Sequence, residues 1–144
     1  MVKIKQLSIF LTNQKGRLYN VLNILAENNI NIRALSLTDT SEFGILRLIV
    51  DNPDKGEQIL EANNYSLKTT QAIAVELEDV PGGLVSILKI LNDNEINLNI
   101  LYAFTQDYSD KAILFLSIPN LDFLIKILKE NSISLVPSNV IYNL

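Results

Sequence analysis

The sequence predicts an α+β protein made of two βαββαβ repeats, each an antiparallel sheet with both helices on one face. Two observations support this prediction. Residues 13–35 match residues 79–101 at a constant spacing of 66, with nine identical positions. Apolar residues also follow strand and helix periods in the same order in both copies. A chain of 144 residues suits two small domains. We expect them at residues 1–70 and 71–144.

The internal repeat is more than a chance match of apolar residues, because glycine, asparagine and turn positions also coincide. Beyond the first helix the spacing becomes 68, so that residues 45–50 pair with 113–118 and residues 59–67 with 127–135. The two-residue difference falls at an expected hairpin tip, where insertions are tolerated. The identical pairs at the spacing of 66 are Gly16/Gly82, Leu18/Leu84, Leu22/Leu88, Ile24/Ile90, Leu25/Leu91, Asn28/Asn94, Ile30/Ile96, Asn31/Asn97 and Leu35/Leu101.

The helices are predicted from the spacing of apolar residues. Both first helices carry apolar residues at i, i+3, i+4 and i+7, starting from Leu18 and from Leu84, so each buries one face. The second helices are expected to begin at Asp54 and Asp122, which we interpret as N-cap residues. The expected strands are residues 7–11, 30–37, 45–50 and 65–70 in the first repeat, and 72–78, 96–104, 113–118 and 133–137 in the second.

This order of elements closes most simply as a split βαβ, or ferredoxin-like, sheet. One sheet face then lacks helices, yet the third strand is apolar on both sides, with Leu48 on one face and Ile49 on the other. A sheet with one face in water alternates more cleanly. We therefore expect the two repeats to pair closely, and two chains to form a homodimer.

The segment after Pro137 has two interpretations. Residues 138–144 align with the beginning of another first strand, which predicts a short strand that pairs with the edge of a second subunit. The alternative is a tail that packs on its own domain.

The composition excludes several classes of function. The net charge is −4 without a Lys/Arg cluster, which argues against a nucleic-acid partner. Histidine and cysteine are absent, so the usual general base, metal ligands and thiol chemistry are missing. No Walker loop or nucleophile elbow is present. We therefore expect a protein without catalytic residues, metal or cofactor. No signal peptide or membrane span is predicted, so we expect a cytoplasmic protein.

Two short motifs resemble the ACT domain, a small-molecule-sensing module. They are NQKGRL at residues 13–18 and DVPGGL at residues 79–84, each between an expected strand and helix and each followed by an Ile-Asn that opens the second strand. Lys15 stands where the family usually has proline. The resemblance covers nearly the whole chain twice. It implies a non-catalytic regulatory protein that binds small molecules, often amino acids, at the seam between paired domains.

The physical chemistry of such a loop agrees with this use. The first N–H groups of a helix lack intrahelical partners and favour an anion such as a carboxylate. Glycine lets a ligand approach because it has no Cβ. The resemblance implies that the ligand is contacted by the polar residue three positions before the glycine and by the asparagine that opens the second strand. The candidate ligand-binding residues are Asn13, Gly16, Arg17, Leu18 and Asn31 in the first repeat, and Asp79, Gly82, Gly83, Leu84 and Asn97 in the second.

Structural explanations compete with these roles. Gly16 and Gly82 are also explained by a tight turn, and Asn31 and Asn97 by capping of a helix end. Asp79 is also explained as an N-cap. As a ligand contact, Asp79 accepts an ammonium and repels a carboxylate, which predicts that the two sites differ. Arg17 either pairs with a ligand carboxylate or faces solvent.

Three functional hypotheses remain open. The first is a regulatory protein that binds an amino acid or related metabolite between repeats or subunits and transmits the change to a partner protein. The second is an interaction module without a ligand, whose open sheet face docks an enzyme. The third is a regulatory subunit of a biosynthetic enzyme such as acetolactate synthase.

Overall fold

The computed structural model describes residues 1–12, 14–39, 42–105 and 110–144. The chain forms two compact units. The first-repeat unit contains Lys5–Thr70 together with Asn139–Leu144, and the second-repeat unit contains Gln71–Ser138 together with Met1–Ile4. The boundary after residue 70 lies inside a single strand, β4 (Ser66–Glu78), which contributes residues to both units.

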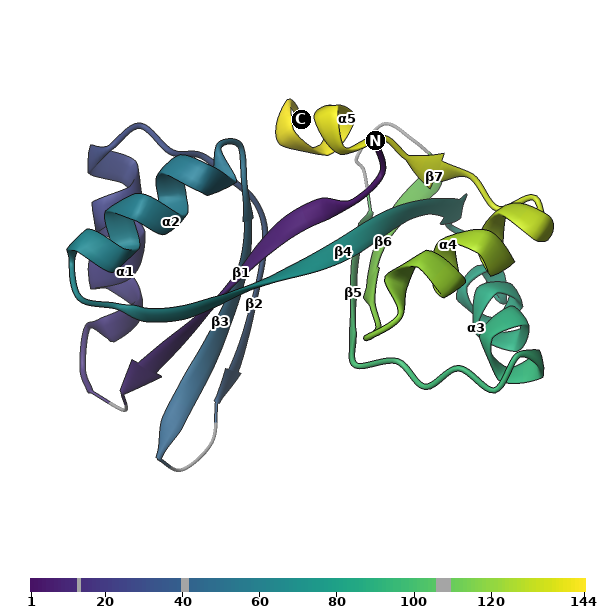
Figure 1. The fold of residues 1–144 in the computed structure, drawn as a ribbon, viewed down its shortest axis with the longest axis horizontal. Coiled ribbons are helices and arrows are strands. Elements are labelled where there is room, and N and C mark those ends of the chain that lie inside the picture. Colours follow the sequence, from purple (N-terminus) through teal and green to yellow (C-terminus); the bar gives the residue numbers. More distant parts are fainter. Residues whose placement is uncertain (13, 40–41, 106–109) are drawn as a thin grey trace. The chain divides into compact units, whose positions relative to one another are not determined.

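The first-repeat unit has the predicted order of strands and helices (Figure 1). Its sheet has the order β2-β3-β1-β4. The pairs β1–β3 and β2–β3 are antiparallel, with Ile9 opposite Leu46 and Leu35 opposite Leu48. Helices α1 and α2 lie next to each other (Figure 1). The remaining elements are β1 (Ile4–Thr12), α1 (Arg17–Glu27), β2 (Ile32–Asp39), β3 (Phe43–Val50) and α2 (Pro53–Ala62).

The second-repeat unit repeats this arrangement. Strand β4 pairs antiparallel with β6 and β7, and β6 pairs antiparallel with β5. The order β7-β4-β6-β5 corresponds, strand for strand, to that of the first sheet. The predicted α+β fold of two ferredoxin-like βαββαβ repeats is therefore confirmed. The elements after β4 are α3 (Gly83–Asp93), β5 (Ile100–Thr105), β6 (Lys111–Ser117), α4 (Leu121–Glu130) and β7 (Leu135–Val136).

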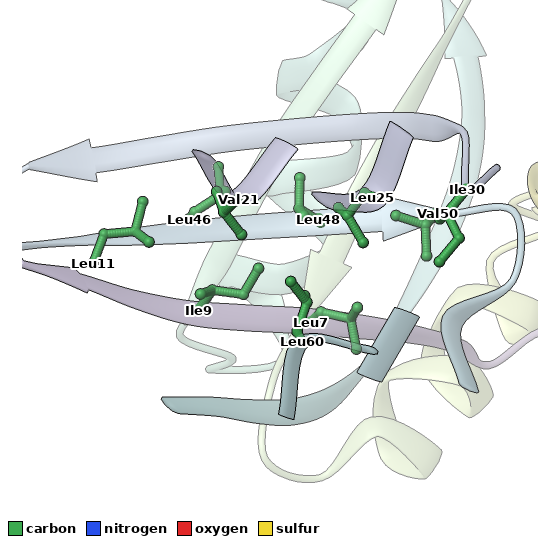
Figure 2. Close-up of a cluster of buried hydrophobic side chains, with 10 residues drawn as sticks. All are labelled: Leu7, Ile9, Leu11, Val21, Leu25, Ile30, Leu46, Leu48, Val50 and Leu60. Carbon is green, nitrogen blue, oxygen red and sulfur yellow. The ribbon is translucent and has the colours of Figure 1, made fainter. Parts of the chain in front are cut away.

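The core of the first-repeat unit lies between the sheet and its helices (Figure 2). Alternate residues of β1 and β3 point toward Val21 and Leu25 of α1 and toward Leu60 of α2. Burial of each such side chain contributes about 1.5–3 kcal/mol. The second-repeat unit has an equivalent core, with Ile87 and Leu91 of α3 at the places of Val21 and Leu25. The first core consists of Leu7, Ile9, Leu11, Val21, Leu25, Ile30, Leu46, Leu48, Val50 and Leu60.

The N-cap of the second helix of each repeat lies two residues before the predicted one. The Asn52 side chain accepts a hydrogen bond from the Lys55 N–H at 3.3 Å, and Asn120 accepts one from the Phe123 N–H at 3.2 Å. The prediction of Asp54 and Asp122 as N-caps is therefore wrong. Both aspartates lie in the first turn. There they pair with Lys5 and Lys3, each at 2.8 Å.

These caps have measurable consequences for stability. We expect Asn52→Ala and Asn120→Ala each to lower the free energy of unfolding by about 1 kcal/mol, because a helix N–H loses its partner. The neighbouring changes Asp54→Ala and Asp122→Ala remove exposed ion pairs and are expected to cost about half as much. Urea unfolding followed by circular dichroism measures both sets. An aspartate change that costs more than its neighbouring asparagine change would contradict the assignment.

The C-terminal segment folds as a short helix, α5 (Ser138–Tyr142). The prediction of a strand here is wrong. Ile141 is fully buried. The Tyr142 hydroxyl accepts a hydrogen bond from the Lys5 N–H at 2.8 Å, and the Tyr142 carbonyl accepts one from Arg33 Nε at 2.9 Å. These contacts belong to the first-repeat unit, although the segment follows the second repeat in sequence.

The N-terminal segment likewise joins the unit of the other repeat. The Met1 carbonyl accepts a hydrogen bond from the Ser138 N–H at 3.0 Å, and Val2 packs against the second core. Met1–Ile4 thus belongs to the second-repeat unit. The longest described helices, α1 and α3, have 11 residues, and none of the described helices has the length and hydropathy of a membrane span.

Candidate functional site

A hollow of about 300 Å³ lies at the beginning of α1 in the first-repeat unit. The end of β1, the first turn of α1 and the turn between α2 and β4 line it. Its polar residues include Thr12, Gln14, Asn20 and Ser66. Asn13, a candidate from the sequence, lies outside the described residues.

An equivalent hollow of about 470 Å³ lies at the beginning of α3 in the second-repeat unit. Its lining comes from the corresponding elements, and the repeat spacing relates residue to residue. Gly83, Ser86 and Ser134 line it at the positions that Arg17, Asn20 and Ser66 occupy in the first repeat. The two repeats therefore share a concave site as well as a fold.

The helices that begin at these hollows differ from the other two long helices. Gly16 and Gly82 precede α1 and α3 in the left-handed conformation, with φ of 78° and 84°. Neither helix has a side-chain cap. Within the described chain, the N–H groups of the second and third helical residues of α1 and α3 have no hydrogen-bond partner. An asparagine side chain caps α2 and α4, whereas α1 and α3 begin beside the two loop hollows without a side-chain cap.

The glycines of the second loop have two different structural reasons. Gly82 has a positive φ, and nothing lies within 4 Å of the place its Cβ would take. At Gly83, an added Cβ would lie 2.2 Å from the Glu78 carbonyl oxygen, which no real structure tolerates. The backbone of this loop therefore requires glycine at both positions for its own geometry. The absence of side chains at these two positions is therefore explained by the fold without a ligand.

The guanidinium of Arg17 is bound within its own unit. It donates hydrogen bonds to the carbonyls of Leu11 and Thr12, at 3.3 and 2.9 Å, and to the Asp39 carboxylate at 2.6 Å. Only 14% of its side chain is exposed. The expectation that Arg17 faces solvent is therefore wrong. Its side chain ties the end of β1 to the end of β2.

The contacts of Arg17 predict a structural penalty for its loss. We expect Arg17→Ala to lower the free energy of unfolding by about 2 kcal/mol, because the Leu11 and Thr12 carbonyls and the Asp39 carboxylate lose their hydrogen bonds from the guanidinium. Arg17→Lys should recover less than half of this loss, since an ammonium cannot reproduce the planar fork. Urea unfolding measures both variants. Wild-type stability in Arg17→Ala would show that these contacts contribute nothing to the fold.

Asn31 lies in a different hollow, of about 360 Å³, beyond the C-terminal end of α1. Its N–H donates to the Asp51 carboxylate at 3.0 Å, and its carbonyl accepts from the Asp51 N–H at 2.9 Å. Helix α1 has 11 residues, and a rise of ~1.5 Å per residue separates its ends by roughly 16 Å. Within one unit, Asn31 therefore does not join the loop hollow at Gly16. Asn97 is exposed at the corresponding place beyond α3.

Asp79 and the two leucines complete the predicted set. Asp79 is exposed and its N–H donates to the Asp110 carbonyl at 2.8 Å. Since Gly82 precedes α3 without any side-chain cap, the alternative of Asp79 as N-cap is wrong. Leu18 packs against the first core, whereas Leu84 is exposed. Neither leucine side chain is among the residues that line the hollows.

The two hollows differ in charge. In the first, Arg17 is the only charged residue among the lining residues that the structure describes, and Asp39 neutralises it. The second is lined by Glu76, Glu78 and Lys111. The hydrogen bond with Glu78 raises the pKa of Lys111, and desolvation opposes that change. From the sequence, we predict that Asp79 makes the two sites differ. In the structure, the charged residues that distinguish the second hollow lie on β4 and β6.

Comparison with known proteins identifies the family. The sequence matches the family model described as the ACT domain pair over residues 2–144. The chain belongs to the ACT domain pair family. This ACT domain pair is similar in structure to protein BT0572 from Bacteroides thetaiotaomicron, with 35% identity, a TM-score of 0.93 and coverage of 99% of this chain and 98% of that one. No curated protein sequence gives a significant match.

Two further structures share the fold of this ACT domain pair at low identity. The regulatory subunit of aspartate kinase from Thermus thermophilus has 11% identity and a TM-score of 0.63, covering 90% of this chain and 91% of that one. The regulatory subunit from Thermus flavus has 12% identity and a TM-score of 0.60, covering 90% and 93%.

Proposed function

We propose that this ACT domain pair is a non-catalytic regulatory protein that binds a small carboxylate-bearing metabolite, an amino acid, at its loop hollows. The observation that supports this proposal most is the recurrence of one hollow in both units, each time beside open N–H donors at the beginning of a helix. A regulatory role agrees with the fold that the chain shares with aspartate kinase regulatory subunits.

The ligand carboxylate would accept hydrogen bonds from the open N–H groups of Leu18 and Tyr19, or of Leu84 and Val85. The positive end of the helix dipole strengthens such bonds. In the second hollow, the lining residues Glu76 and Glu78 offer carboxylates to the ligand ammonium. In the first, Thr12 and the asparagine side chains offer neutral oxygens instead.

The proposal is tested by isothermal titration of the folded protein with each of the twenty amino acids. Asn20→Asp and Ser86→Asp place a carboxylate in the first and second hollow, respectively, and are expected to abolish binding in the copy that works. Asn92→Asp makes the same charge change at the far end of α3 and should bind as the wild type does. A folded protein that binds none of the twenty would contradict the proposal.

The ligand would also raise thermal stability. A ligand that binds only the native state stabilises it by about 2.7 kcal/mol at a hundredfold excess over its dissociation constant. A thermal-shift screen of the same amino acids should therefore select the same ligand. Agreement between the two methods separates specific binding from heat of dilution.

We also propose a homodimer in which a partner chain completes the site. Asn31 and Asn97 lie one helix length away from the loops of their own units, so they would reach a ligand only from another ACT unit. The exposed Leu35 and Leu37 on the edge strand β2 favour such pairing. Sedimentation of Leu37→Lys should then show monomers, with Thr38→Lys on the other face as control. Equal sedimentation of Leu37→Lys and wild type would contradict this edge as the interface.

The same exposed edge supports a second candidate function. An interaction module without a ligand, or a regulatory subunit of a biosynthetic enzyme, would use Leu35 and Leu37 to contact its partner. This candidate gains weight if titration finds no amino acid and the isolated chain is monomeric.

A further inference from the structure

A second hollow, of about 310 Å³, adjoins the loop hollow of the first-repeat unit. The two share Phe10, Leu11, Thr12 and Ser66 as lining residues, and Phe43 completes the second one. Phe10 and Phe43 are 43% and 42% exposed. The first-repeat site therefore has a polar end at the beginning of α1 and an aromatic end on β1 and β3.

The register of the sheet places the two aromatic residues on one face. Thr12 pairs with Phe43, and Phe10 pairs with Ile45. Paired residues share a face, as do residues two apart along a strand, so Phe10 and Phe43 are diagonal neighbours. Aromatic side chains reach one another across such a diagonal. They form two apolar walls at the end of the sheet, on the face opposite the buried Leu11.

The second repeat shows that the fold does not require these phenylalanines. At the repeat spacings of 66 and 68, Phe10 corresponds to Glu76 and Phe43 to Lys111. Lys111 forms an ion pair with Glu78, the residue that corresponds to Thr12. The same strands thus fold with charged residues at these positions. Two partly exposed phenylalanines in the first repeat therefore point to a function there.

We infer that the first-repeat site selects a carboxylate with an aromatic side chain, of the class of the aromatic amino acids. The inference rests on the proposed function and specifies its ligand. The ring lies between Phe10 and Phe43, and the carboxylate lies at the beginning of α1. Aromatic rings prefer offset or edge-to-face contacts of this kind.

The size and charge of the site agree with such a ligand. The adjoining hollows of about 300 and 310 Å³ fall within the range of small-molecule sites. Among the described lining residues the only charged one, Arg17, is already paired with Asp39, so a neutral side chain meets no unpaired charge from them. The charged second-repeat hollow lacks the aromatic walls and binds this class weakly.

L-tryptophan is the probe for the test, because the chain contains no tryptophan. Indole fluorescence, excited beyond the absorption of tyrosine, then reports the ligand alone. We expect a blue shift on binding to the wild-type protein, and about tenfold weaker binding for Phe10→Ala and for Phe43→Ala. Phe123→Ala is the matched control, since Phe123 is 40% exposed on α4 of the other unit. It should bind as the wild type does.

A double exchange tests selectivity directly. Phe10→Glu with Phe43→Lys installs the residues of the second repeat and should abolish tryptophan binding, with circular dichroism confirming the fold. L-phenylalanine should compete with the probe, and glycine should not. Competition by both to the same degree would overturn the inference.

Other outcomes separate this inference from the proposed function. If aromatic amino acids fail to bind but another amino acid does, the inference is overturned and the proposed function stands. If none binds, both fail. Unchanged tryptophan affinity in the phenylalanine variants overturns the inference, and so does a change in sedimentation without a change in affinity, which would show that the pair contacts a second chain.

Discussion

Gly83→Ala is expected to lower the free energy of unfolding by about 3 kcal/mol, because the loop before α3 has no room for a methyl group. The new Cβ would lie 2.2 Å from the Glu78 carbonyl oxygen. A backbone oxygen cannot move aside as a flexible side chain can, so either the loop or the first turn of α3 must shift. Urea unfolding followed by circular dichroism measures the loss.

Gly82→Ala is the matched control for this prediction. Its added Cβ meets no atom within 4 Å, so only the positive φ opposes the change. That strain costs about 1–2 kcal/mol. Wild-type stability in Gly83→Ala together with weaker amino-acid binding would contradict the steric argument. It would show instead that Gly83 serves the approach of the ligand.

Ile141→Ala is expected to destabilise the first-repeat unit by about 3 kcal/mol, although residue 141 lies at the far end of the chain from most of that unit. Ile141 is fully buried, and its segment belongs to that unit. Tyr142→Phe should cost a further ~1 kcal/mol, since the Lys5 N–H loses its acceptor. Chemical unfolding gives the totals, and hydrogen exchange of β1 and β2 locates the loss.

Val140→Ala controls for a change in the propensity of α5 itself. Val140 is 44% exposed, so its truncation should change stability by less than about 0.5 kcal/mol. Equal effects of the Val140 and Ile141 changes would refute the buried role of the segment. Loss of protection confined to β5 and β6 would place the segment with the other unit.

The fold was accessible from the sequence because its main signals are local and occur twice. The spacing of Leu18, Leu22 and Leu25 predicts α1, and the same spacing from Leu84 predicts α3. The helix caps were misplaced because asparagine and aspartate both cap well. The sequence does contain the signal that corrects the first cap, since Pro53 favours the first helical position and so indicates Asn52 as N-cap.

Features that depend on contacts between distant parts of the chain could not be predicted from the sequence. Nothing in residues 138–144 indicates that Ile141 is buried in the unit of the first repeat, because that placement depends on contacts more than a hundred residues away, such as Lys5 with Tyr142. The alignment with a first strand therefore predicts a strand where a helix forms. The clash at Gly83 likewise depends on a carbonyl orientation that residue types do not encode.

The candidate site was accessible in part. The two loops and their glycines are visible as a repeated motif, whereas the serines of the opposite turn, Ser66 and Ser134, were missed. Their signal is the change of spacing to 68, which aligns them and brings the turn before the last strand into register. The separation of Asn31 from Gly16 also follows from helix length alone, once α1 is known to span 11 residues.

Strand β4, which is shared by both units, also has a consequence for proteolysis of the protein and for recombination of its gene. Proteases and gene rearrangements separate most domains at an exposed, flexible linker. Here the boundary after Thr70 runs through a strand, and Ala72–Val75 just beyond it are buried. Limited proteolysis should not release either repeat intact, and a recombination event that removed one repeat with β4 would leave the other sheet short of a strand. We therefore expect the two repeats to be degraded and inherited together.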